Sequence, residues 1–123
     1  MEIDKSAIDM IVRKLSRRFD SNIGVAYLVG DRSSEYLEVE DVSFPEQKSQ
    51  PGYAEIGETE QIIELERLHK NNQTAIGVVQ YNASYYAIKG AAEKDIFDEL
   101  IFLPCIRLIV NRKGEYSFLG EKE

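Results

Sequence analysis

The feature that most constrains the fold is an unbroken apolar run from residue 22 to residue 30, NIGVAYLVG. The run is rich in residues that favour strands, and it does not alternate between apolar and polar positions. A strand of this kind is usually covered on both faces. We therefore expect the chain to build a sheet with other elements packed on each side of it.

Further strands are expected along the chain. In order, the predicted strands cover residues 22–30, 35–44, 74–81, 85–88, 105–110 and 115–119. The second of these alternates between apolar and polar residues, so it predicts a half-exposed strand that pairs with the first through a turn at residues 31–34. A turn at residues 111–114, with Gly114 where a type I turn favours glycine, predicts a closing hairpin.

Helices are expected at residues 6–19, 58–69 and 91–100. Ser6 and Asp9 have the form of a capping box at the start of the first helix. Its apolar stripe consists of Ile8, Ile11, Val12, Leu15 and Phe19. The stripe of the second helix consists of Ile62, Leu65 and Leu68, and Asn71-Asn72 end that helix. Residues 45–57 contain two prolines and two glycines and predict a loop.

These elements predict an α/β fold with a mixed central β-sheet and helices packed on its faces. At 123 residues the chain is expected to form a single domain over residues 1–123. The composition, 43% hydrophobic and 30% charged, is that of a globular protein. No stretch is long and apolar enough to span a membrane, and the N-terminus lacks the pattern of a signal peptide.

Net charge and the numbers of cysteine and histidine residues limit the partners, the cellular location and the metal ligands that we expect. The formal net charge of −7 argues against a general attraction to nucleic acid or to anionic lipid. The chain has one cysteine, Cys105, which excludes an internal disulfide and favours a cytoplasmic location. The single histidine, His69, leaves carboxylates as almost the only ligands for a transition metal.

The segment GVVQYNAS, residues 77–84, places two amides where an apolar strand ends. Gln80 and Asn82 are two residues apart, so on a strand their side chains point the same way. One interpretation is that the two amides occupy a pocket that once held a metal. The alternative is that they are polar residues at a strand end, bonded to nearby backbone.

Three segments carry a resemblance to a known family. They are IGVAYLVGDRSSEYLEVEDVSFPEQ, YAEIGETEQIIELERLHKNNQTAIGVVQYNAS and CIRLIVNRKGEYSFL. They resemble the opening hairpin, the helix with its metal-binding strand, and the closing strands of the JAMM/MPN (Mov34/MPN/PAD-1) domain. The resemblance covers most of the chain. It implies an MPN (cytidine deaminase-like) fold, which in that family supports zinc isopeptidases that remove ubiquitin-like modifiers.

The zinc motif of that family is altered here. Its two histidines correspond to Gln80 and Asn82, and the proline after them corresponds to Ala83. With the usual spacing, its serine and aspartate correspond to Gly90 and Glu93. The region that supplies the family's general base offers only Asn22, Ile23 and Gly24 in this chain.

Ligand chemistry then argues against zinc hydrolysis. Zinc prefers imidazole and thiolate, and a neutral amide is a weak donor. Without the metal, no bound water is made acidic enough to become a hydroxide nucleophile. The resemblance therefore implies a noncatalytic member with vestigial pocket positions Gln80, Asn82, Gly90 and Glu93. We expect neither a metal nor another cofactor.

Other residues are candidates for an interaction surface. Arg13, Lys14, Arg17 and Arg18 lie on one helix, where they form either a solvated face that balances acidic residues such as Glu58 and Glu60, or a docking patch. Tyr81, Tyr85 and Tyr86 either anchor an interface or cover the sheet. The apolar residues 100–103 belong either to a dimer face or to the core. His69, near the stripe of the second helix, is expected to stabilise the end of that helix, and Cys105 is expected to be a buried apolar residue.

The function expected from these observations is an interaction or scaffold protein that binds a protein partner or a second copy of itself. The resemblance implies assemblies that handle ubiquitin-like modifiers or belong to the proteasome. One alternative is a module that binds a small ligand or a nucleic acid through the vacated pocket or the basic helix. Another is a hydrolase that has rebuilt its site from Glu93, His69 and nearby hydroxyls.

Overall fold

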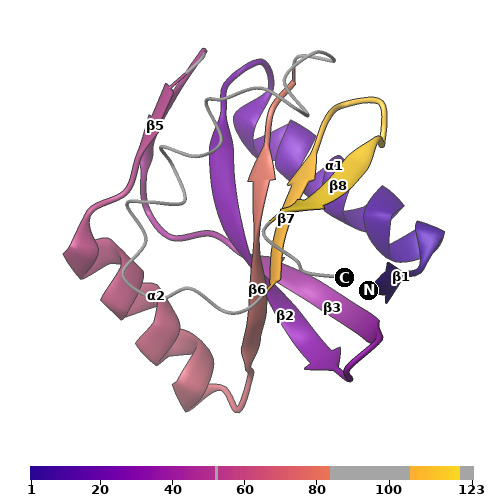
Figure 1. Cartoon of the computed structure of the whole chain (residues 1–123). Coiled ribbons are helices and arrows are strands. Elements are labelled where there is room, and N and C mark those ends of the chain that lie inside the picture. The colour runs from indigo at the N-terminus through magenta and orange to yellow at the C-terminus, as the bar shows by residue number, and fades with distance from the viewer. Residues whose placement is uncertain (52, 84–105, 120–123) are drawn as a thin grey trace.

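The computed structural model describes residues 1–51, 53–83 and 106–119. In chain order its elements are β1 (Glu2–Ile3), α1 (Lys5–Phe19), β2 (Gly24–Arg32), β3 (Tyr36–Ser43), β4 (Lys48–Gln50), β5 (Tyr53–Glu55), α2 (Glu58–Lys70), β6 (Ala75–Tyr81), β7 (Ile106–Val110) and β8 (Tyr116–Leu119) (Figure 1). The predicted strand at 85–88 and the predicted helix at 91–100 lie outside the described residues. None of the described helices is long and apolar enough to cross a membrane.

The main sheet is mixed, as the sequence predicts. Its described strands have the order β1-β3-β2-β6-β7-β8. The β2–β3 and β7–β8 pairs are antiparallel hairpins, and β6 pairs with β7 in parallel. Helix α2 lies in the crossover from β3 to β6, also as expected. The sheet is curled, and the fold class is the predicted α/β arrangement.

Both faces of β2 are covered, which explains its unbroken apolar run. Ala26 and Leu28 belong to a core cluster that includes the buried residues of α1, here called the α1-side core. Val25 and Tyr27 belong to a second cluster that includes Leu68 of α2, here called the α2-side core. Successive residues of a strand face opposite sides, so the two helices lie on opposite faces of the sheet (Figure 1).

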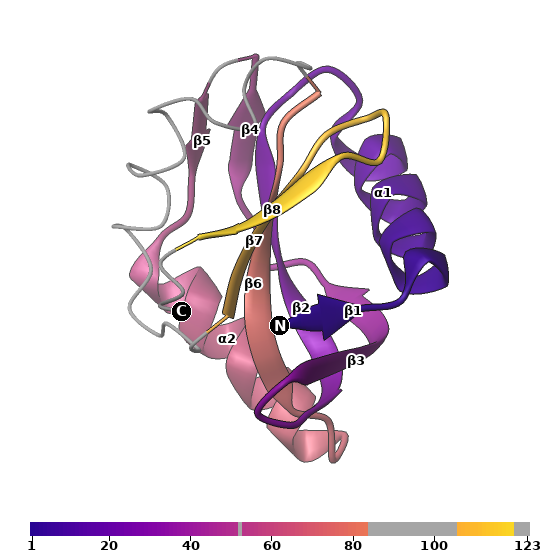
Figure 2. The same ribbon diagram turned by 45° about the vertical axis from the view of Figure 1, so that its right-hand side comes forward.

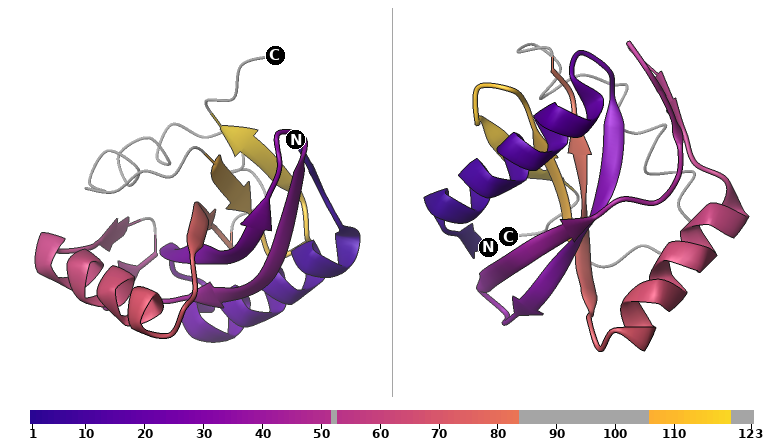
Figure 3. Two further views of the ribbon diagram at one scale, coloured as in Figure 1. Left: turned by 90° about the horizontal axis from the view of Figure 1, so that it is seen from below. Right: turned by 180° about the vertical axis from the view of Figure 1, so that it is seen from behind.

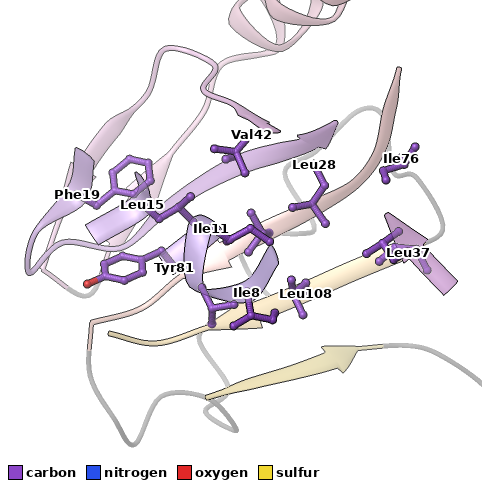
Figure 4. Close-up of a cluster of buried hydrophobic side chains, with 14 residues drawn as sticks. Ile8, Ile11, Leu15, Phe19, Leu28, Leu37, Val42, Ile76, Tyr81 and Leu108 are labelled. Carbon is purple, nitrogen blue, oxygen red and sulfur yellow. The ribbon is translucent and has the colours of Figure 1, made fainter. Parts of the chain in front are cut away.

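Helix α1 packs through the predicted stripe. Ile8, Ile11, Leu15 and Phe19 are buried against the sheet (Figure 4), and Val12 is partly buried. The predicted capping box is wrong, because the helix begins at Lys5 and its N-cap is Asp4, without a side-chain cap bond. Ser6 therefore lies inside the helix.

Helix α2 packs on the α2-side core through two residues of its predicted stripe, with Leu68 buried and Leu65 partly buried. Its buried residues are Gln61, Glu64 and Leu68, whereas Ile62 is 45% exposed and Ile63 is 58% exposed. The expectation that Ile62 is buried is wrong. The reason is that polar side chains of α2 face the sheet, where Glu64 meets a hydroxyl partner on β3.

The predicted loop at residues 45–57 contains a small hairpin, β4–β5 (Figure 2). Strand β3 pairs with β2 only as far as Tyr27. Beyond that point, the Gln47 side chain takes over: its Nε2 donates to the Val25 carbonyl at 2.8 Å, and its Oε1 accepts from the Val25 N–H at 2.9 Å. The Ile23 N–H donates to the carbonyl of Gln50 at 3.1 Å. The Gln47 side-chain amide thus continues the hydrogen bonding along β2 where β3 no longer pairs with it.

The turn predicted at residues 31–34 is shorter than expected, because β2 runs on to Arg32. The Ser33 N–H donates to the Tyr36 carbonyl at 2.8 Å to close the turn. Within the hairpin, the register shifts between Val29 and Gly30. A Cβ at Gly30 would lie 2.0 Å from the Glu38 carbonyl oxygen, so this close approach requires glycine.

Candidate functional site

Gln80 lies near the end of β6, between Val25 of β2 and Ile109 of β7. Its side chain is fully buried, and among the residues that the structure describes neither its amide oxygen nor its amide nitrogen has a hydrogen-bond partner. Its two cross-strand neighbours belong to the α2-side core and are apolar. A buried amide without partners costs about 1–3 kcal/mol, so the fold retains an unfavourable group at this position.

Asn82 directly follows β6 and is 7% exposed. Its N–H donates to the Val110 carbonyl at 3.0 Å, which extends the pairing with β7 by one residue. Tyr81, between the two amides, packs in the α1-side core. Backbone alternation therefore places Gln80 and Asn82 on the opposite, α2-side face. Gly90 and Glu93 lie outside the described residues.

The region expected to supply a general base contains no carboxylate. Ile23 is buried in the α2-side core. Gly24 has no room for a side chain, because a Cβ there would lie 2.3 Å from ring carbons of Phe19. The remaining residue, Asn22, is partly buried and carries an amide that does not titrate.

The residues placed here do not fit a zinc ion, which the MPN domain would imply. Gln80 and Asn82 offer neutral amides, whereas zinc prefers imidazole and thiolate. Among the residues that the structure describes, no group of three or more His, Cys, Asp or Glu side chains could hold a metal ion. We therefore derive no chemical step through zinc.

Tyr81 does not belong to an exposed aromatic surface, contrary to one of the two interpretations of the sequence. It is fully buried and stacks on Phe19, with 6.3 Å between the ring centroids (Figure 4). Its hydroxyl donates to the Asp20 carbonyl at 3.1 Å and accepts a bond from the Arg112 Nε at 3.3 Å. Tyr85 and Tyr86 lie outside the described residues.

A polar cluster that sequence reasoning missed joins β3 to α2. The Ser43 hydroxyl donates to the Glu64 carboxylate. Arg67 donates to the same carboxylate through Nη2 at 2.5 Å and through Nε at 3.2 Å. Glu64 is 9% exposed. Burial alone would raise the pKa of Glu64, but the hydrogen bonds from Arg67 and Ser43 outweigh it and lower that pKa.

This cluster does not suit general-base catalysis. A carboxylate with a lowered pKa is a poor base at neutral pH, and Arg67 balances its charge. Tyr27, on the same side of the sheet, is fully buried, and its hydroxyl has no hydrogen-bond partner within residues 1–51, 53–83 and 106–119. Burial and then the nearby charge of Glu64 raise the pKa of Tyr27 to about 12. The only local signal in the sequence was the helical spacing of Glu64 and Arg67.

The basic face of α1 is partly occupied by internal contacts. Lys14 lies 2.6 Å from an Asp41 carboxylate oxygen, and the Arg18 guanidinium lies 4.9 Å from the centroid of the Phe44 ring. The acidic neighbour of Lys14 is thus Asp41, not Glu58 or Glu60 as named from the sequence. Arg13 and Arg17 are exposed.

His69 is exposed in the last turn of α2, so the expectation that it lies near the buried stripe is wrong. Arg67 and Lys70 lie in the same turn, and cations there favour the negative end of the helix dipole. Residues 100–103 and Cys105 lie outside the described residues.

Two cavities open on the α2 side of the molecule. A larger one of about 620 Å³ is lined by Glu46, Gln47, Lys48, Glu55, Ile56, Gly57 and Glu60. A smaller one of about 290 Å³ is lined by Arg18, Phe44, Glu46, Glu60, Ile63 and Glu64. Neither of these two is lined by Gln80 or Asn82, so the amides of β6 do not open into either.

Comparisons with known proteins identify the fold. No protein-family model and no curated protein matches the chain. The solution structure of protein DSY2949 from Desulfitobacterium hafniense is similar, with a TM-score of 0.62 and 18% identity over 94% of this chain and 79% of that one. The crystal structure of AF2198, a JAB1/MPN domain protein from Archaeoglobus fulgidus, is also similar, with a TM-score of 0.51 and 16% identity over 95% of this chain and 94% of that one. The chain therefore has an MPN-like fold.

Proposed function

We propose that this chain is a noncatalytic MPN-like protein that acts by binding other proteins. Its role would be that of an interaction or scaffold subunit in an assembly that handles ubiquitin-like modifiers or belongs with the proteasome. The observation that supports this proposal is Gln80. At a position that the resemblance assigns to a zinc ligand, the MPN-like sheet carries a buried amide whose oxygen and nitrogen have no hydrogen-bond partner among the described residues.

Two further features support the noncatalytic part of this proposal. Where the family's general base is expected, this chain has Ile23, with an aliphatic side chain, and Gly24, with no side chain. A carboxylate at position 24 would collide with Phe19, whose packing belongs to the α1-side core. A return to hydrolysis at this site would thus need more than one substitution.

The test has two parts that use the full chain. Purified protein is analysed for zinc and is incubated with a cleavable ubiquitin-like fusion, and we expect neither stoichiometric zinc nor cleavage. Tagged protein is then recovered from native extract, and we expect a stoichiometric protein partner or self-association. Stoichiometric zinc, or turnover that is lost in Glu93→Ala, contradicts the proposal and favours a rebuilt hydrolase.

A second candidate function rests on Arg13 and Arg17, which are exposed on α1. A nucleic-acid module that uses this face would bind with an affinity that falls steeply with salt. The test is binding to single-stranded and double-stranded probes, with Arg13→Glu plus Arg17→Glu as the variant. Binding that weakens with salt and is lost in the variant would favour this candidate over the first.

A further inference from the structure

Strand β3 is paired along only part of its outer side. In the described sheet β1 is the last strand on that side, and its two residues pair with Tyr36 and Leu37. Within residues 1–51, 53–83 and 106–119, no strand pairs with β3 on this side beyond Leu37. The β2–β3 hairpin projects near the N-terminus in the front view (Figure 1) and in the view from behind (Figure 3). An unpaired strand of this kind accepts an extended segment of another chain.

The backbone of Val39 presents a donor and an acceptor on this side. The Glu38 carbonyl oxygen and the Glu40 nitrogen are among the atoms closest to a Cβ placed on Gly30 of β2, so both face that strand. The C=O and the N–H of a trans peptide point in opposite directions. The Val39 N–H and C=O therefore face away from β2, toward the unpaired side of β3. Residues 38–40 are here called the β3 edge.

A cavity of about 320 Å³ adjoins the β3 edge. It lies between β3 and the first two turns of α1, and its lining includes Ser6, Ala7 and Met10 of the helix. Met10 and Val39 are partly buried and pack against the α1-side core, so part of the cavity wall is apolar. Paired strands lie about 4.8 Å apart, and their side chains alternate between the two faces. A strand added beside Val39 therefore has a recess for one apolar side chain.

The charged side chains at the β3 edge are acidic. Asp4, Glu38 and Glu40 line the cavity and are exposed, and in the described part of the chain none of the lining residues is basic. Asp41, the next residue of β3, lies 2.6 Å from the ammonium group of Lys14, so its charge is already balanced. Like charges on directly opposed strands are unfavourable. The β3 edge therefore repels a second copy of itself and attracts a basic strand.

We propose that the β3 edge binds an extended basic segment of a partner protein, which joins the sheet as a strand in line with β1. The proposal rests on the binding role proposed above and names the place and the chemistry of one partner. Main-chain hydrogen bonds to Val39 align the segment. Its lysine or arginine side chains pair with Glu38 and Glu40, and one apolar side chain enters the cavity beside Met10.

The first experiment measures the binding of three fluorescent peptides of about ten residues to the full chain. In the probe peptide, valine and lysine alternate. One control peptide carries glutamate in place of lysine, which tests the charge. The other keeps the side chains of the probe but has a methyl group on every backbone nitrogen, so it cannot donate main-chain hydrogen bonds. We expect the probe to bind about tenfold more tightly than either control, or better.

The second experiment compares two variants with the same change in net charge. Glu38→Lys with Glu40→Lys reverses the β3 edge, and Glu58→Lys with Glu66→Lys reverses two exposed glutamates of α2 as the matched control. We expect the edge variant to bind the lysine probe about tenfold more weakly and to gain affinity for the glutamate peptide. The control should change the affinity by less than about twofold, because its charges are remote and screened. Circular dichroism checks that both variants are folded.

The third experiment locates the bound segment by amide hydrogen exchange. A strand added at the β3 edge accepts a hydrogen bond from the Val39 N–H, so this amide should exchange about tenfold more slowly in the presence of the lysine probe. The amides of β8, at the other margin of the described sheet, should keep their exchange rates.

Several outcomes would overturn the β3 edge as a docking site. They are a lysine probe that does not bind, a methylated peptide that binds equally well, an edge variant that binds like the control variant, and an unchanged exchange rate of Val39. A partner from native extract that binds the edge variant as tightly as the wild type refutes only this site and leaves the binding role. Zinc-dependent cleavage refutes the proposed function, and the edge is then judged by the peptide measurements alone.

Discussion

The ring of Phe19 lies against the backbone of Gly24, so that a Cβ at position 24 would be 2.3 Å from its Cε1 and Cζ atoms. This contact joins the end of α1 to the start of β2. It also excludes a side chain at position 24, next to the strand-end amides Gln80 and Asn82. A side chain at position 24 would have to displace a ring that is 3% exposed and packs in the α1-side core.

We therefore expect Gly24→Ala to destabilise the protein by about 1–3 kcal/mol, as overpacking of a core does. Urea denaturation measures this change. In a double-mutant cycle, the smaller side chain of Phe19→Leu should relieve part of the cost, so the two substitutions together should cost less than their sum. Additive costs would show that the ring does not restrict position 24.

The polar cluster of Glu64 predicts a dependence of stability on acid. Burial raises the pKa of Glu64, but the bonds from Arg67 and Ser43 more than offset this, and its pKa in the folded protein falls below the usual 4.5. A depressed pKa means that the stabilisation is present above the unfolded value and is lost as the pH falls through the folded value. The free energy of unfolding should therefore decrease as the pH falls below about 4.5.

The substitution Glu64→Gln should remove the part of the free energy of unfolding that changes with pH in the acid range. We expect it to lower the free energy of unfolding at pH 7 by about 1–2 kcal/mol and to flatten the profile below pH 5. Chemical denaturation at a series of pH values measures both effects. Glu66→Gln is the matched control, because Glu66 is exposed on the same helix and should change stability by less than about 0.5 kcal/mol. Equal profiles for Glu64→Gln and the wild type would contradict the assigned cluster.

The buried strands could be predicted from sequence because their apolar runs are local and continuous. β2, β6 and β7 lie where the runs at 22–30, 74–81 and 105–110 place them, within a few residues. The hairpin β4–β5 could not be predicted in the same way. Its link to β2 uses the side-chain amide of Gln47, which has no periodic signal.

Leu65 and Leu68 of α2 pack inward as predicted. Ile62 was mispredicted because apolar periodicity assumes that every apolar residue of the stripe faces inward. Here Glu64 faces inward, since Ser43, 21 positions away in the chain, accommodates its carboxylate. Because Ser43 and Glu64 are far apart in the sequence, the pattern of residues within the helix does not indicate this contact. For the candidate site, the sequence placed Gln80 and Asn82 at the end of an apolar strand. The lack of hydrogen-bond partners for Gln80 among the described residues depends on its neighbours from β2 and β7.

Gln80→Met is expected to stabilise the protein. The substitution nearly conserves volume and removes a donor and an acceptor that have no hydrogen-bond partners in the described part of the chain. The gain should be about 1–3 kcal/mol, the cost of a buried unsatisfied polar group. Thermal and urea denaturation measure it. A loss of stability would show that the Gln80 amide makes a favourable interaction, and the amide would then no longer support a vacated pocket.

The last prediction tests whether the amides stand where metal ligands belong. The double variant Gln80→His with Asn82→His returns two imidazoles to the end of β6, and we expect zinc to raise its melting temperature while the wild type does not respond. A ligand that binds only the folded state stabilises it in proportion to the logarithm of its concentration over the dissociation constant. The double variant without zinc should be less stable than the wild type, because a buried imidazole also needs partners.

Two controls make this outcome specific. Gln80→Leu with Asn82→Leu alters the same positions without adding ligands, so zinc should not stabilise it. Adding Glu93→Ala to the histidine variant should weaken the zinc response, because the family pattern assigns the third ligand to that position. Zinc stabilisation that is absent from the histidine variant, or equal in all three variants, would mean that these side chains do not converge on one point. The amides would then be ordinary strand-end residues, and Gln80 would no longer support the proposed binding role.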